Sequence, residues 1–202
     1  MSLITKIEPQ TKNKDRVNIF LDGEFKLGCS LELAMLNHLK VNTEISDEQL
    51  EKLVFENEKG QALNKAVTLL GKNLKTRRQM RTYLNDKGYS KNIVDYVIDK
   101  LSEYNYINDI NYATIYVKSV KNKYGKLKII NSLRQKGISE KDIDEVMQEF
   151  ESDTQSILTL AQKYMKNKEI NQDNMAKLYR HLLSKGFSYD EVNSVVRSIK
   201  GE

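Results

Sequence analysis

A phrase that recurs three times at one fixed interval constrains this chain more than any other feature. The sequence reads KGYS at Lys87–Ser90, KGIS at Lys136–Ser139 and KGFS at Lys185–Ser188, so each glycine stands 49 residues after the one before. Self-similarity at a period of roughly 20 to 50 residues is typical of proteins built from stacked structural units. The sequence therefore predicts a tandem array in which each unit packs mainly on its neighbours.

Each copy of the repeat predicts a helix, a tight turn and a second helix. The glycine suits the left-handed residue that ends a helix, because it has no β-carbon. The serine two residues later suits the N-cap of the next helix. Apolar residues recur at helical spacing around the glycine. Eight residues before the glycine stand Met80, Ile129 and Leu178, and four before it stand Leu84, Leu133 and Leu182. Six residues after it stand Val94, Ile143 and Val192.

A leading helix is expected before each pair, over residues 61–71, 109–121 and 154–167, which completes three-helix units. The chain begins differently. The stretch VNIFLDGEFKLG alternates apolar and polar residues around Asp-Gly at 22–23, the strongest short signal for a β-hairpin. The apolar side of this hairpin is expected to comprise Val17, Ile19, Leu21, Phe25 and Leu27.

Further signals surround this hairpin. Leu3, Ile4 and Ile7 favour a third strand before it. Ser30 and Ser46 suit the N-caps of two helices, and Gln49 could complete a capping box with Ser46. We therefore predict a mainly α fold: tandem three-helix repeats in an elongated array, with a small N-terminal β-hairpin or three-stranded lead-in. The expected parts are residues 1–58, with the hairpin and helices, and three three-helix repeats at 59–104, 105–152 and 153–202.

The charge is distributed unevenly along the chain. The net charge is +5 overall, but residues 1–58 carry −4, residues 59–139 carry +12 and residues 140–202 carry −3. Residues 59–85 and 110–139 contain no acidic residue at all. A one-signed surface repels itself, and an anionic partner would relieve that repulsion. We favour such a partner; a basic face that contacts only solvent is the alternative.

The helix-turn-helix arrangement also raises the possibility of sequence-specific DNA recognition. That mode needs a second helix whose polar side chains contact bases in the major groove. Here the second helices are acidic or mixed in charge, as in EKDIDEVMQEF, and the positive charge lies on the first helix of the pair. The signal for sequence-specific recognition is therefore weak.

One long segment carries a family resemblance. INDINYATIYVKSVKNKYGKLKIINSLRQKGISEKDI resembles the central repeat of RecX regulatory proteins, and RRQMRTYLNDKGY is similar to their first repeat. The opening DRVNIFLDGEF resembles their strand-rich lead-in, so the likeness spans nearly the whole chain. Family members often have proline where Lys126 stands here. The matching positions of the first two repeats are Arg77, Arg81, Leu84, Lys87 and Gly88, and Asp109, Tyr112, Ala113, Gly125, Ile129, Leu133, Lys136, Gly137 and Ile138.

The resemblance implies a regulator of RecA, the recombinase that polymerises on single-stranded DNA. Such proteins bind the RecA filament and usually restrain its ATP hydrolysis, strand exchange and coprotease activity, in DNA repair, recombination and the SOS response. The expected contacts to filament and DNA are Arg77, Arg78, Arg81, Lys87, Lys118, Lys121, Lys123, Tyr124, Lys126, Lys128, Arg134 and Lys136. Tyr124 is included because it lies among basic residues and outside the apolar stripe to which Tyr112 and Tyr116 belong.

Two other functions remain open on the residues alone. One is a general nucleic-acid-binding module that competes for single strands, and the other is a protein scaffold without nucleic-acid contact. No enzyme motif, cofactor or metal spacing stands out, since Cys29, His38 and His181 are isolated in the sequence. We expect a soluble, cytoplasmic, non-enzymatic monomer without a membrane span.

Overall fold

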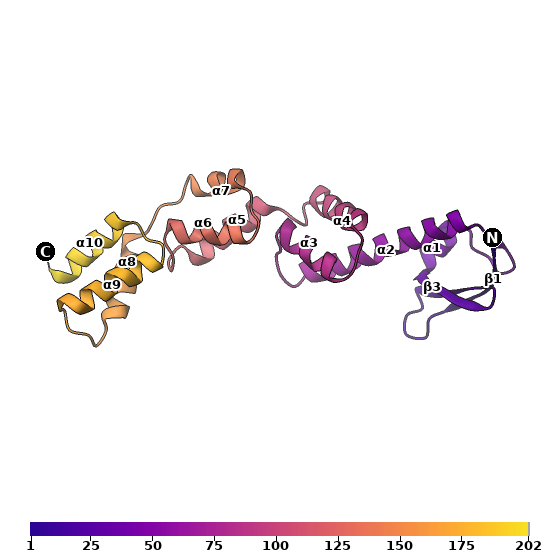
Figure 1. Cartoon of the computed structure of the whole chain (residues 1–202), viewed down its shortest axis with the longest axis horizontal. Helices are drawn as coiled ribbons and strands as arrows, with labels where there is room; N and C mark the ends of the chain where they lie inside the picture. Colours follow the sequence, from indigo (N-terminus) through magenta and orange to yellow (C-terminus); the bar gives the residue numbers. More distant parts are fainter. Residues whose placement is uncertain (202) are drawn as a thin grey trace. The chain divides into compact units, whose positions relative to one another are not determined.

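The computed structural model describes residues 1–201, and within them the chain is mainly helical, with ten α-helices and one small sheet (Figure 1). The prediction of fold class is confirmed in these terms. The chain divides into two compact units. One comprises residues 1–72 and 83–100, and the other comprises residues 73–82 and the chain from 101 onward. None of the helices in the described part is long and apolar enough to cross a membrane.

The first unit opens with an antiparallel sheet whose strand order is β3-β2-β1-β4. The predicted hairpin and third strand are confirmed, whereas the two-residue β4 was not predicted. Asp22 and Gly23 both have positive φ angles, 51° and 87°, as a two-residue hairpin turn of this hand requires. The strands are β1 (Ser2–Pro9), β2 (Arg16–Leu21), β3 (Glu24–Ser30) and β4 (Glu44–Ile45).

One residue of the hairpin does not face the core as expected. The pairing of β2 with β3 shifts between Ile19 and Phe20, so that Ile19 pairs with Leu27 but Phe20 pairs with Phe25. The shift turns Phe25 to the outer face, where its ring is 58% exposed and meets Phe20 edge-to-face at 5.8 Å. The core of this unit instead takes Cys29, which is fully buried.

Two helices follow the sheet, α1 (Leu31–Leu36) and α2 (Asp47–Leu70). Ser46 accepts a hydrogen bond from the Gln49 N–H while the Gln49 side chain accepts one from the Ser46 N–H, which confirms the predicted capping box. Helix α2 continues without a break past residue 58, so the leading helix of the first repeat is the second half of α2. The domain limits expected from the sequence stay a prediction.

The three repeats contain the remaining helices. The boundary between the two units runs through α3 and α4. The helices are α3 (Arg77–Asp86) and α4 (Lys91–Glu103); α5 (Asp109–Val120), α6 (Lys126–Gln135) and α7 (Glu140–Met147); and α8 (Thr154–Met165), α9 (Gln172–Ser184) and α10 (Tyr189–Lys200).

The local signals of the repeat are confirmed. Gly88, Gly137 and Gly186 have φ angles of 82°, 83° and 85°, in the left-handed region. Ser139 and Ser188 accept hydrogen bonds from N–H groups of the first turns of α7 and α10. The nine apolar positions predicted to line the repeats are all 2% exposed or less. The helices of each repeat therefore pack as the spacing predicts.

Within the second unit, successive repeats meet through the start of one helix and the turn of the next repeat. The Gly125 N–H, at the start of α6, donates to the Lys185 carbonyl at 3.0 Å, and the Leu127 N–H donates to the Gly186 carbonyl at 3.3 Å. In the same register, 49 residues earlier, the buried Thr76 hydroxyl donates to the Lys136 carbonyl at 2.7 Å. We call these two contacts the inter-repeat junctions.

The junctions explain why glycine is needed beyond the left-handed backbone. A β-carbon on Gly186 would stand 2.5 Å from the Lys128 amide nitrogen, and one on Gly125 would collide with the backbone of Gly186. One on Gly137 would collide with the side chain of Arg78. By contrast, apart from Gly88 itself and its two chain neighbours, no described residue has an atom within 4 Å of a β-carbon built on Gly88.

This contrast leads to a testable prediction. Gly88→Ala and Gly186→Ala both force alanine into the left-handed region, at roughly 1–2 kcal/mol each. Only Gly186→Ala also pushes apart two backbones, so we expect it to lower the melting temperature further than Gly88→Ala does. Thermal unfolding followed by circular dichroism measures the difference, and equal shifts would contradict the role assigned to the junction.

Candidate functional site

The junction between the second and third repeats gathers basic and aromatic side chains. The ammonium groups of Lys128 and Lys185 lie 5.3 Å and 5.2 Å from the centroid of the half-buried Tyr124 ring. Lys128 also donates from Nζ to the Ser184 carbonyl at 3.3 Å. An ammonium group within about 6 Å of a ring centroid is attracted by the electron-rich face of the ring. The Tyr124 ring therefore attracts both ammonium groups.

The third repeat extends this group. His181 stacks on Tyr164 at a centroid distance of 4.5 Å, and the Lys168 ammonium lies 3.4 Å from the centroid of Tyr164. Burial, and then the positive charges of Lys185 and Lys168, hold the pKa of His181 below its ordinary value. This environment favours the neutral imidazole. We call the whole set the junction cluster: Tyr124, Lys128, Tyr164, Lys168, His181 and Lys185.

The junction cluster is suited to an anion that is spread out along a chain. The ammonium groups of Lys128, Lys168 and Lys185 lie over aromatic rings, and that of Lys128 also donates to a carbonyl. Among the described residues, none of the three forms an ion pair with a carboxylate. Lysine binds phosphate as a point charge without reading a base. Because lysines already lie over the rings of Tyr124 and Tyr164, a phosphate backbone fits this surface better than stacked bases do.

The other predicted residues of the second repeat fall into two groups. Lys123 and Lys126 are exposed beside the junction cluster. Lys136 is half-buried and lies over Tyr116, 5.0 Å from its centroid, and 5.9 Å from that of Tyr112. Both tyrosines pack against the core of the repeat, as the sequence predicts. Tyr124 packs against this core as well, although the sequence placed it outside the apolar stripe.

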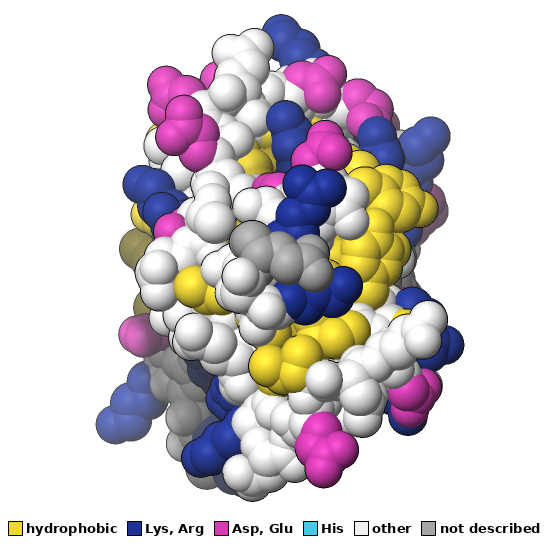
Figure 2. Space-filling model, turned by 90° about the vertical axis from the view of Figure 1, so that its left-hand side faces the viewer, with side chains coloured by type: hydrophobic (Ala, Val, Ile, Leu, Met, Phe, Trp, Pro, Cys, Tyr) yellow, Lys and Arg dark blue, Asp and Glu magenta, His cyan; other side chains and the backbone are white. Residues whose placement is uncertain are grey.

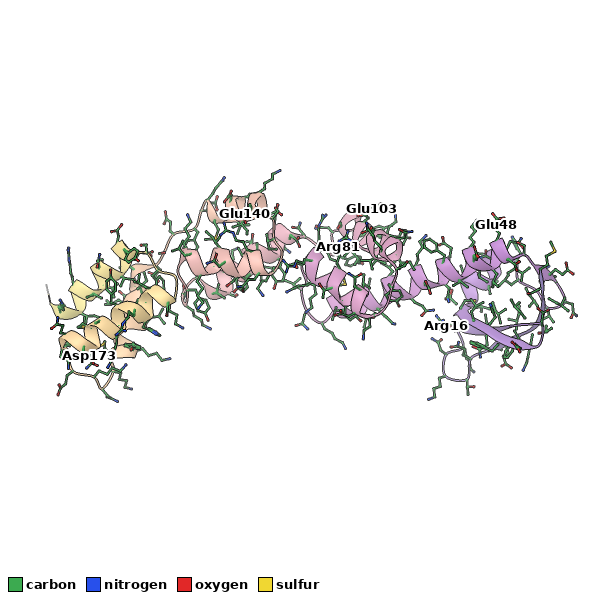
Figure 3. All side chains as sticks on the ribbon, viewed as in Figure 1. Arg16, Glu48, Arg81, Glu103, Glu140 and Asp173 are labelled. Atoms are coloured by element: carbon green, nitrogen blue, oxygen red, sulfur yellow. The ribbon has the colours of Figure 1, made fainter. Side chains whose placement is uncertain are left out.

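The remaining basic residues of the second repeat, Arg134, Lys118 and Lys121, lie near acidic side chains from later in the chain. Arg134 donates from both Nε and Nη2 to the Glu140 carboxylate at 2.7 Å, and these bonds hold the pKa of Glu140 below its ordinary value (Figure 3 labels Glu140). Lys118 and Lys121 line a hollow that also contains acidic side chains. These are Glu145, Glu149, Glu151 and Asp153. Although residues 110–139 contain no acidic residue, the surface around these three basic residues therefore carries both positive and negative charge.

The candidates of the first repeat are distributed over both units. The Arg77 N–H donates to the Asp109 carboxylate at 2.9 Å, and burial raises the pKa of Asp109 although this bond opposes the rise. Arg78 covers Gly137 with its aliphatic stem, and Arg81, labelled in Figure 3, lies on α3. Lys87 belongs to the first unit, 5.7 Å from the ring of Tyr83. Arg77, Arg78 and Arg81 belong to the second unit.

Sequence reasoning missed four of the six residues of the junction cluster. Tyr164, Lys168, His181 and Lys185 all lie in the third repeat, beyond the strongly positive stretch 59–139. A usable signal was present, because Lys185 aligns with the predicted Lys136 in the next copy of the repeat. The contact between Lys185 and Tyr124 depends on the packing of the third repeat on the second, which no local sequence pattern predicts.

The described residues offer little for other chemistry. They contain no group of three or more His, Cys, Asp or Glu side chains that could hold a metal ion. Burial raises the pKa of the Cys29 thiol, which lies in the core of the first unit. That thiol is therefore a poor nucleophile.

Family models match four successive parts of the chain. Residues 2–46 match the model described as regulatory protein RecX N-terminal domain. Residues 62–101, 108–147 and 151–196 match the first, second and third three-helix domains of RecX. The four matches follow the order of the sheet and the three repeats.

Whole-length relatives have the same description. A regulatory protein RecX of Clostridium botulinum (strain Eklund 17B / Type B) is 38% identical over 98% of this chain and 96% of its own length. One from Clostridium tetani is 34% identical over 97% and 94%. A crystal structure of regulatory protein RecX matches with a TM-score of 0.75 and 27% identity over all of both chains. A RecX from Lactobacillus salivarius matches with a TM-score of 0.65 and 25% identity, over 73% of this chain and 99% of that one.

The junction cluster makes a prediction that can be followed at one atom. A phosphate backbone bound there would favour the charged imidazole, so adding a single-stranded oligonucleotide should raise the pKa of His181 towards its ordinary value. By linkage, the oligonucleotide should bind more tightly as the pH falls through that range. The chain has only two histidines, so proton NMR of the imidazole Cε1–H signals reports His181 with His38 as an internal control. An equal response of both, or none at His181, would argue against the site.

Proposed function

The chain belongs to the RecX family of regulatory proteins, and from this membership we propose that it binds the filament of RecA on single-stranded DNA and restrains it. The restrained activities would be RecA's ATP hydrolysis, strand exchange and coprotease activity, in DNA repair and recombination. The chain itself would catalyse nothing and need no cofactor. Its effect would come from binding alone.

The junction cluster is the observation that supports a nucleic-acid contact in this function. Three lysines from two repeats converge there, and the exposed Lys123 and Lys126 lie beside them. Contacts of this kind do not depend on base sequence and weaken as salt concentration rises. That suits a partner that coats DNA of any sequence. We therefore assign the DNA-facing role to the junction cluster, and the paired Arg134 a minor one.

A second candidate function rests on the same cluster. A general nucleic-acid-binding module would compete with RecA for bare single strands without touching RecA. Both functions predict binding that weakens with salt, so salt does not separate them. They differ in the amount of protein needed, because competition requires enough protein to cover the DNA. A pure protein scaffold, the third possibility, would bind its partner with little dependence on salt.

The order of addition separates the first two functions. RecA filaments are assembled on single-stranded DNA before this protein is titrated in, and ATP hydrolysis is followed. We expect activity to fall when the protein is still far scarcer than DNA binding sites, because it acts on the filament. Loss of activity only once the DNA is saturated would favour competition, and no loss would contradict RecA regulation.

A charge reversal tests the face that is used. The triple variant Lys126→Glu, Lys128→Glu and Lys185→Glu should need roughly tenfold more protein for half-inhibition of RecA, about 1.4 kcal/mol of lost binding. The matched control reverses three exposed lysines of the first unit, Lys12, Lys14 and Lys26, and changes the net charge equally. Circular dichroism should show unchanged helicity in both. Equal loss in both variants would mean that net charge, not this cluster, carries the contact.

A further inference from the structure

The turn between α4 and α5 presents two exposed tyrosine side chains. Tyr104 is 65% exposed and Tyr106 is 56% exposed. By contrast, Tyr112 and Tyr116 of the next helix are half-buried and pack against the core of the second repeat. The two rings of the turn therefore add little buried surface to the fold. We call residues 104–106 the tyrosine turn.

Exposure alone does not single out this turn. Figure 2 shows hydrophobic side chains next to Lys and Arg side chains on the face that it draws, so apolar surface is present elsewhere too. The tyrosine turn differs in how firmly its backbone is held. Asn105 has a left-handed φ of 56°, and the N–H groups of Tyr106 and Ile107 both donate to the Leu101 carbonyl, at 2.8 and 3.2 Å. Ile107 is 2% exposed and anchors the turn in the core. The backbone that carries Tyr106 is therefore fixed before any ligand binds.

The ring of Tyr106 also differs from the rings of the other two repeats. Lysine ammonium groups lie over Tyr112, Tyr116, Tyr124 and Tyr164. Among the described residues, no lysine lies over the ring of Tyr106 in this way. A ring face that is already occupied by an ammonium group is a poor stacking surface. The ring of Tyr106 is thus open to a flat partner.

Positive charge lies on one side of the tyrosine turn. The Arg77 N–H, at the start of α3, donates to the carboxylate of Asp109 at the start of α5, three residues after Tyr106. Arg77 and Arg78 are both exposed, whereas the α4 side of the turn ends in the acidic Glu103. A bound polyanion would therefore follow the start of α3. Proteins that bind single strands combine such positive charge with aromatic rings on which bases stack.

We propose that the tyrosine turn binds an unpaired nucleobase, which stacks on the ring of Tyr106 while Arg77 and Arg78 contact the neighbouring phosphates. The inference rests on the nucleic-acid contact of the proposed function and adds a second site to it. The junction cluster binds the phosphate backbone, and the tyrosine turn binds a base. Every base has a π-face, so stacking does not select a sequence. It does select single strands, because the bases of a duplex already stack on one another.

Binding of a short fluorescein-labelled oligothymidylate, followed by fluorescence anisotropy, tests the site. We expect Tyr106→Ala to weaken binding roughly tenfold and Tyr106→Phe to leave it nearly unchanged, because phenylalanine keeps the ring. Tyr189→Ala is the matched control, since Tyr189 is 68% exposed on α10 of the same unit, and it should bind like the parent protein. Circular dichroism should show unchanged helicity in all three variants.

Two further oligonucleotides show whether the base is what Tyr106 contacts. On an abasic strand of the same length, and on a duplex, the parent protein and Tyr106→Ala should bind equally, because phosphates remain but no base is free to stack. Failure of the parent protein to bind any of the three at low salt would contradict both the nucleic-acid contact and this inference. If the parent protein binds, an unchanged affinity of Tyr106→Ala for oligothymidylate, or an equal loss in Tyr189→Ala or on the abasic strand, would overturn the stacking site alone.

Discussion

A contact between the start of one helix and the turn of the next repeat holds the second unit together. Helix starts leave N–H groups without partners, and helix ends leave carbonyl groups without partners. Here the Gly125 N–H and the Lys185 carbonyl satisfy each other directly. The glycines allow the two backbones to approach closely enough. The same contact brings the ammonium groups of Lys128 and Lys185 close to the ring of Tyr124. The basic cluster is therefore a consequence of the packing between the second and third repeats.

The sequence predicted those features whose causes lie within a few residues. The left-handed glycines, the serine caps, the hairpin turn at Asp22 and Gly23, and the apolar stripes all follow from local backbone and side-chain preferences, and all are present. The repeat multiplied this signal, because three copies support one interpretation. The prediction that Phe25 faces the core was wrong because the register of β2 and β3 shifts near it. The alternation of apolar and polar residues does not predict such a shift.

The candidate site was harder to predict because charge along a sequence is not charge on a surface. The acid-free stretch contains Arg134, yet the fold brings Glu140 to it with two short hydrogen bonds. Conversely, Lys185 lies outside the strongly positive stretch 59–139 but joins the basic cluster across a junction. The second result comes from a contact between segments that no local pattern connects. The charge along the sequence was therefore easier to predict than its distribution on the surface.

The junction between the second and third repeats is made by main-chain atoms and glycine, and this has an evolutionary consequence. A surface side chain can change in charge or size without altering how one repeat attaches to the next. Each repeat can then adapt its exposed face separately while the frame stays constant. Duplication of a 49-residue segment would add a unit that already has both of its attachment points. The fold thus favours change by copying and subsequent divergence over change by redesign of a shared core.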